Sequence, residues 1–65
     1  MNRYQEYIDQ LRKEIRYLRQ NMEIEKPGSR EWLADRREIM ASLEDIKIMK
    51  ELMASENAEQ EKHNE

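Results

Sequence analysis

One apolar pattern, interrupted once, constrains the fold of this 65-residue chain more than any other feature. Apolar side chains recur at alternating intervals of three and four residues, which is the spacing of the a and d positions of a coiled coil. The first stripe consists of Met1, Tyr4, Ile8, Leu11, Ile15, Leu18 and Met22. The second stripe consists of Trp32, Arg36, Ile39, Leu43, Ile46, Lys50 and Met53. The spacing predicts two amphipathic helices, the second with two polar side chains in its stripe.

The interruption lies at Lys26-Pro27-Gly28-Ser29. Proline disfavours the helical conformation of the residue before it, and Gly28 allows backbone angles that close a turn. Ser29 is a good N-cap for a second helix. The sequence therefore predicts a helix over about 2–25, a turn over 26–29 and a helix over about 30–54.

Folding the chain back at Pro27-Gly28 places the two stripes opposite each other. Met22 then meets Trp32, Ile15 meets Ile39, and so on along the helices. The predicted fold class is all-α, an antiparallel two-helix hairpin of the coiled-coil type. The hairpin would form a single domain over residues 1–55, followed by an acidic tail over 56–65 that we expect to be disordered, because it has no large apolar residue.

Composition excludes several classes of protein. Without cysteine, the chain can form neither a disulfide framework nor a cysteine zinc site. No apolar run approaches the roughly 18 residues of a membrane span. A chain this short does not supply both a core and the walls of a catalytic pocket. We therefore expect a cytoplasmic protein that is not an enzyme and has no cofactor.

Candidate catalytic and metal-binding residues are correspondingly weak. His63 is the only histidine and lies in the acidic tail, so neither a metal site nor a Ser–His–acid triad is expected. The many carboxylates lie on predicted helical faces without a cavity. We assign no catalytic and no metal-binding residue.

A second apolar face on the predicted helix 30–54 is the main candidate for function. A single two-helix seam covers one side of each helix, and small chains of this size often gain stability by oligomerising. The residues predicted to bind a partner are Ala34, Ala41, Ile48, Leu52 and Met49. This face predicts either a homodimer, assembling as a four-helix bundle, or docking on a larger protein.

Three arginines give a second candidate surface. Arg12, Arg16 and Arg19 fall on one face of the predicted first helix, where they would contact an anionic partner. The alternative is a solvated flank with pairs inside the helix. The whole chain has a net charge of -3, which argues against a general nucleic-acid binder.

The leading functional hypothesis is a small non-catalytic protein–protein interaction module: a regulator, an inhibitor or an assembly factor. One alternative is a nucleic-acid-associated accessory protein that uses the arginines. Another is a small signalling phosphatase or kinase inhibitor. It follows from size and shape, in which the chain resembles small bacterial hairpins that regulate signalling, such as the sporulation-type aspartyl-phosphate phosphatases. Their Ser-x-x-Leu-Asp stretch is not reproduced, because the nearest residues, Ser42-Leu43-Glu44-Asp45, are spaced differently. No functional residue is carried over from that resemblance.

Overall fold

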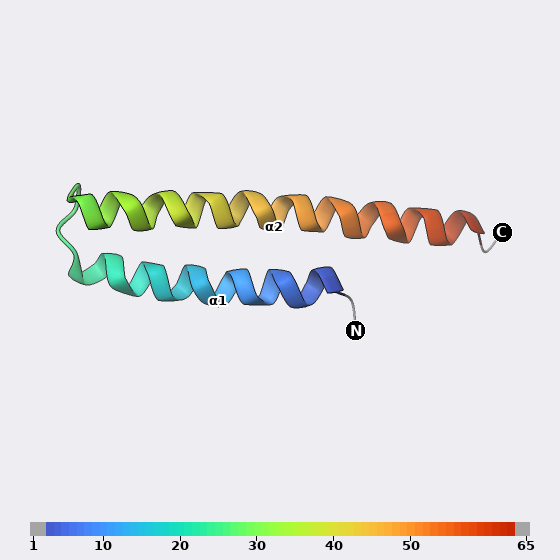
Figure 1. Cartoon of the computed structure of the whole chain (residues 1–65). Coiled ribbons are helices and arrows are strands. Elements are labelled where there is room, and N and C mark those ends of the chain that lie inside the picture. Colours follow the sequence, from blue (N-terminus) through green and yellow to red (C-terminus); the bar gives the residue numbers. More distant parts are fainter. Residues whose placement is uncertain (1–2, 64–65) are drawn as a thin grey trace.

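Two helices pack side by side in the computed structural model of this chain (Figure 1). The structure describes the backbone of residues 3–63 and the side chains of residues 3–56. Helix α1 spans Arg3–Ile24 and helix α2 spans Arg30–His63, and the chain reverses between them. The predicted all-α helical hairpin is confirmed.

The turn forms as the sequence predicts. Gly28 has a φ of 84°, a left-handed conformation that other residues adopt only at a cost. The side-chain oxygen of Ser29 accepts a hydrogen bond of 3.3 Å from the backbone N–H of Trp32. The carbonyl of Ser29 also accepts the first bond of α2, 2.9 Å long, from the N–H of Leu33. Ser29 is therefore the N-cap of α2.

Helix α2 is longer than predicted. It continues to His63, beyond the expected end near residue 54 and through much of the segment expected to be disordered. This segment is rich in glutamate, alanine, glutamine and lysine and has no proline or glycine, so propensity favours the extension of a helix that is already nucleated. The absence of large apolar residues did not end the helix.

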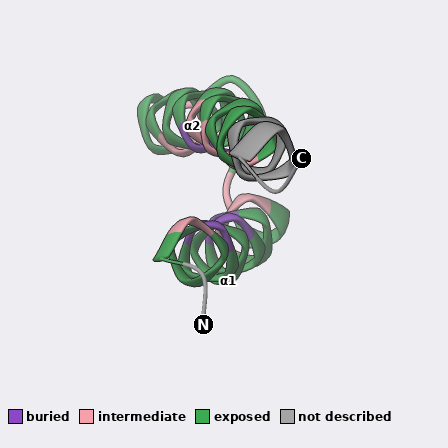
Figure 2. Ribbon diagram, turned by 90° about the vertical axis from the view of Figure 1, so that its right-hand side faces the viewer, coloured by how far each residue is buried: buried purple, intermediate pink, exposed green. Residues whose placement is uncertain are grey.

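The core is a single seam between the two helices. Figure 2 shows the buried residues on the sides of α1 and α2 that face each other, and exposed residues around the outside. The most deeply buried residue is Ile8, with 1% of its surface exposed. The buried apolar residues are Ile8, Leu11, Ile15, Leu18, Ile39 and Ile46, with Met22, Met49 and Met53 packed against them.

Only some residues of the stripe predicted for α2 are buried between the helices. Ile39 and Ile46 are buried as predicted, but Leu43 is 47% exposed and Ser42 is buried in its place. The buried and half-buried residues of α2 are Trp32, Asp35, Ile39, Ser42, Asp45, Ile46, Met49 and Met53. The seam thus uses the residue three positions after Ile39 rather than the one four positions after it. Four large side chains of α1 already fill the seam, and a small side chain opposite them lets the helices approach closely.

The two polar residues of the predicted stripe lie outside the seam. The guanidinium of Arg36 lies over the ring of Trp32, 5.7 Å from its centroid, a cation–π geometry. Lys50 is exposed. The Tyr4 hydroxyl donates a 3.3 Å hydrogen bond to Oε1 of Glu56.

The hairpin is only one helix thick. Its principal extents are 56 × 18 × 11 Å, and the smallest is close to the diameter of a single helix, roughly 10–12 Å. Each helix therefore buries one face against the other and leaves its remaining faces open. This flat shape determines which side chains can meet a partner.

Candidate interaction surfaces

The first candidate surface, here called the outer stripe, consists of Ala34, Ala41, Ile48 and Leu52. All four residues are exposed on α2, as predicted, and Ile48 and Leu52 each expose 41% of their surface. At about 100° per residue they lie close together on the side of the helix away from the seam. The structure thus brings four of the five predicted partner-binding residues together.

The fifth residue, Met49, is placed differently. It is half-buried and packs against the core between the helices. A heptad position three residues after Ile46 faces the seam, and the flexible methionine side chain fills space there. Met49 therefore contributes to the hairpin and only its edge is open to a partner.

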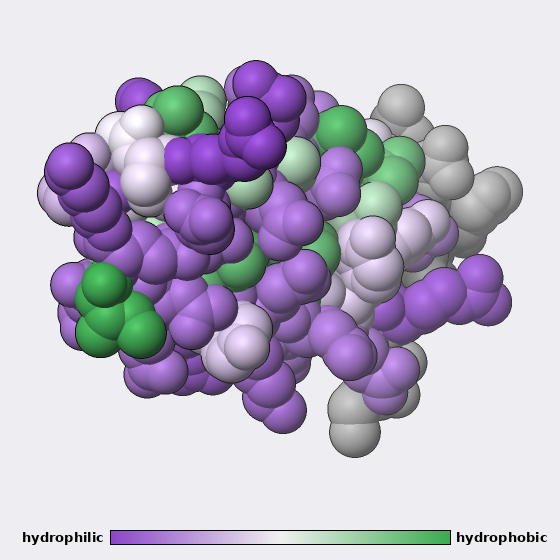
Figure 3. All heavy atoms as spheres, turned by 60° about the vertical axis from the view of Figure 1, so that its left-hand side comes forward, coloured by the Kyte–Doolittle hydropathy of each residue, from purple (hydrophilic) through white to green (hydrophobic). Residues whose placement is uncertain are grey.

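Large apolar residues are exposed on both helices. Among the residues whose side chains are described, eight remain exposed: three lie on α1, and the other five lie on the longer α2. They are Leu33, Met40, Leu43, Ile48 and Leu52. Figure 3 shows apolar patches on one face of the molecule, separated by hydrophilic side chains. The exposed apolar surface is distributed around α2 rather than gathered in one cluster.

The second candidate surface, here called the arginine groove, lies between the helices along one edge of the hairpin. It has a volume of about 730 Å³. Its lining residues are Asp9, Arg12, Lys13, Ile15, Arg16 and Arg19 of α1 and Leu43, Ile46 and Lys50 of α2. The three arginines that the sequence placed on one helical face therefore share one groove.

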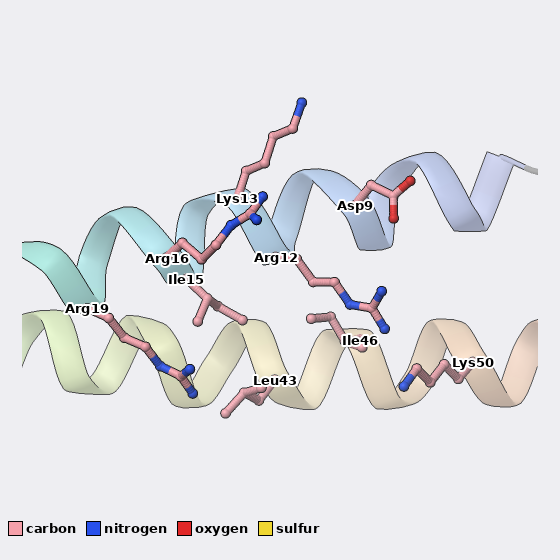
Figure 4. A pocket seen from close by; sticks show the side chains of 9 residues that line it. All are labelled: Asp9, Arg12, Lys13, Ile15, Arg16, Arg19, Leu43, Ile46 and Lys50. Atoms are coloured by element: carbon pink, nitrogen blue, oxygen red, sulfur yellow. The ribbon is translucent and has the colours of Figure 1, made fainter.

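The side chains of the groove divide into a floor and walls (Figure 4). Ile15 and Ile46 point toward each other from opposite helices, and Leu43 lies beside them. Arg12 and Arg19 extend from α1 toward α2, whereas Lys13 points away from α2. Five cationic side chains and one carboxylate line this groove, so its charge favours an anionic ligand although the whole chain is acidic.

Glu25 and Asp35 form a carboxyl pair near the turn that the sequence did not predict. Glu25 is half-buried, and its Oε1 atom is fully covered without a hydrogen-bond partner. Burial raises the pKa of Glu25, and the neighbouring Asp35 carboxyl, by hydrogen bonding and by its charge, raises it further, as does the charge of Glu31. A hydrogen bond between two carboxyl groups requires a proton on one of them. The sequence did not indicate this pair, because Asp35 is not part of the apolar stripe predicted for the second helix.

We expect Glu25→Gln to stabilise the hairpin near neutral pH. A carboxyl whose pKa is raised by folding contributes its full stability below its unfolded pKa, and this contribution is lost as the pH rises through the folded pKa. The melting temperature of the variant should therefore exceed that of the wild type at neutral pH, and the difference should shrink as the pH falls toward about 4.5, the ordinary pKa of glutamate. Glu23→Gln, the same change at an exposed site of α1, is the matched control for this measurement.

Histidine, aspartate and glutamate are the side chains among the described residues that could hold a metal ion. Within that part of the chain, no group of three or more histidine, aspartate or glutamate side chains is placed to hold a metal ion. His63 lies outside the residues whose side chains are described. Neither helix, over residues 3–63, has an apolar run long enough to cross a membrane. Comparison of the chain with models of protein families, with curated proteins and with solved structures finds no match.

Proposed function

We propose that this chain is a small, non-catalytic protein–protein interaction module of the cytoplasm that acts through exposed helical surface, chiefly that of α2. Such a module serves as a regulator, an inhibitor or an assembly factor. The observation that carries the proposal is the set of five exposed large hydrophobic residues on α2, which the single seam with α1 does not cover. Full burial of a large apolar side chain is worth roughly 1.5–3 kcal/mol, so covering the exposed half of one contributes about half of that.

The partner is a second copy of the chain, a larger protein, or both. A second copy that covers α2 would complete a four-helix bundle and remove the open faces of a molecule one helix thick. The small side chains of Ala34 and Ala41 allow another helix to approach closely, while Ile48 and Leu52 supply contact area. Association of this kind makes the melting temperature rise with protein concentration.

The test is the double substitution Ile48→Glu with Leu52→Lys. Both side chains are exposed in the hairpin, so the helix pairing should persist, with unchanged helicity by circular dichroism. Self-association, measured by sedimentation velocity, or retention of a purified larger partner should be lost, because charged groups would be buried in the contact. The opposing charges leave the net charge unchanged.

A matched control changes two exposed apolar residues of α1. Tyr17→Glu with Ile24→Lys replaces side chains that are 64% and 88% exposed, and association should survive. A wild-type chain that stays monomeric at high concentration, together with an Ile48–Leu52 variant that still binds every partner of the wild type, would refute the role of the outer stripe.

The arginine groove supports a second candidate function, that of a nucleic-acid-associated accessory protein. The observation in its favour is the clustering of five cations around one groove. Phosphate contacts of this kind weaken steeply as salt concentration rises. Fluorescence anisotropy of a labelled oligonucleotide over a salt series tests this function, and binding at physiological salt that requires Arg12, Arg16 and Arg19 is its expected signature.

A further inference from the structure

We propose that the arginine groove binds an acidic amphipathic helix of a partner protein. In this complex, apolar side chains of the incoming helix lie on the groove floor and its carboxylates lie along both walls. The proposal rests on the proposed function, because it states the chemistry of the partner that an interaction module of this shape selects. It concerns a different face from the outer stripe.

The floor of the groove suits the apolar side of a helix. Ile15 and Ile46 are buried core residues whose edges line the groove, and Leu43 extends the apolar surface outward with 47% of its area exposed. A second hollow of about 450 Å³ continues from Leu43 along α2 as far as Ala54. Two antiparallel helices leave such a furrow along their seam, and a third helix packing into it forms a three-helix bundle.

The walls of the groove are cationic on both sides. Arg12 and Arg19 lie two turns apart on α1, about 10 Å along the helix, and both extend toward α2. On the facing wall, Lys50 lines both hollows, and the second hollow is also lined by Lys47 and by one carboxylate, Glu51. In a helix with apolar a and d positions, the e and g positions flank the contact on its two sides. Glutamates at e and g therefore meet arginines on one wall and lysines on the other.

The arginine side chains favour carboxylates that are held in a fixed geometry. The guanidinium of arginine binds a carboxylate through two parallel hydrogen bonds, and the binding is stronger where an apolar contact beside it excludes water. The groove provides this combination, because Leu43 and Ile15 lie beside the arginines (Figure 4). Asp9 is the one carboxylate among the residues that line the arginine groove. It can neutralise only one of the five cationic side chains there.

Other occupants fit the groove less well. The acidic end of the chain, residues 56–65, has Ala58 as its only apolar residue and cannot cover the floor. A second copy that presents its own groove would bring lysines and arginines against each other. A nucleic acid would use the walls but would gain nothing from the exposed Leu43 side chain. Charge and apolar surface together favour an acidic helix.

The test uses a synthetic peptide as the probe and the full chain as the receptor. The peptide has about three heptads, with leucine at a and d and glutamate at e and g, so that repulsion between glutamates opposes its self-association. We expect measurable binding by fluorescence anisotropy. Arg12→Glu with Arg19→Glu should weaken it by on the order of 100-fold, since two attractive contacts become repulsive.

A second substitution separates the floor from the walls. Leu43→Ser should weaken peptide binding about tenfold, because it removes apolar contact and leaves every charge in place. Arg30→Glu with Arg37→Glu, the same charge change as Arg12→Glu with Arg19→Glu but at exposed α2 residues that line neither hollow, should leave the affinity nearly unchanged. All substituted residues are exposed, and circular dichroism should confirm that each variant retains the hairpin.

Two outcomes would overturn the proposal. One is equal binding of a scrambled peptide of the same composition, because a scrambled sequence has no apolar face. The other is tighter binding of a single-stranded oligonucleotide through the same arginines, with no effect of Leu43→Ser, which would assign the groove to nucleic acid. Neither outcome changes the test of Ile48 and Leu52 on the outer stripe, so failure of this inference is distinguishable from failure of the proposed function.

Discussion

Leu11→Asp and Ile39→Asp should each unfold the hairpin. Both side chains are buried in the middle of the seam, one from each helix. An aspartate there would be charged without a buried partner, which costs about 3–5 kcal/mol. A chain of this size has a single small core that rarely supplies more than about 3–5 kcal/mol of net stability. Loss of helicity by circular dichroism at room temperature is the expected measurement.

Leu43→Asp is the matched control for this prediction. The heptad pattern in the sequence places Leu43 in the seam, whereas the structure exposes 47% of it. The variant should keep its helicity and melt within a few degrees of the wild type, because surface substitutions change stability by about 0.5 kcal/mol or less. Unfolding of Leu43→Asp, with Ser42→Asp folded, would show that α2 is rotated relative to its observed orientation, because the two possible stripes share Ile39 and differ in these two residues.

Ile8→Ala should destabilise the hairpin by about 2–4 kcal/mol. Ile8 is the most deeply buried side chain, with 1% of its surface exposed, so its truncation removes apolar contact and leaves a cavity. The cost is a large part of the stability available to so small a core. Urea denaturation should show a lower midpoint for unfolding, with most molecules unfolded in water if the wild type is marginal.

Ile24→Ala provides the comparison within the same helix. Ile24 is 88% exposed, so the same chemical change should alter the free energy of unfolding by less than about 0.5 kcal/mol. Similar losses at the two positions would contradict the burial pattern of α1.

The sequence alone predicted α1 more accurately than α2. The apolar residues of α1 that recur once per turn from Ile8 to Leu18 are all buried, as their heptad spacing indicates. In α2, Leu43 and Ser42 are neighbours, and the stripes that contain them share Ile39 and Ile46. Adjacent residues point about 100° apart around a helix, and the spacing of apolar residues does not distinguish two stripes that differ by one residue at a single position. The choice between these stripes therefore depended on how α2 packs against α1.

The sequence likewise predicted those parts of the candidate surfaces that lie on one helix, and not those that need both helices. Clustering of Arg12, Arg16 and Arg19 follows from local helical spacing, so the sequence predicted it. Their apolar neighbours Leu43 and Ile46, and the lysine on the facing wall, come from the other helix and could not be assigned to the same groove beforehand. The Glu25–Asp35 pair was missed for the same reason, since its two carboxyls lie on opposite sides of the turn.

Local chemistry determined the helices, the turn and its cap: heptad spacing, the proline–glycine pair and Ser29 each act over a few residues. Tertiary packing decided the rotation of α2, and with it which apolar residues fill the core and which remain open to a partner. The physical reason is that an amphipathic helix with apolar residues on several sides has more than one face it can bury. Close packing against the large side chains of α1 selects one of them, and Leu43 and Ile48 remain exposed as a result.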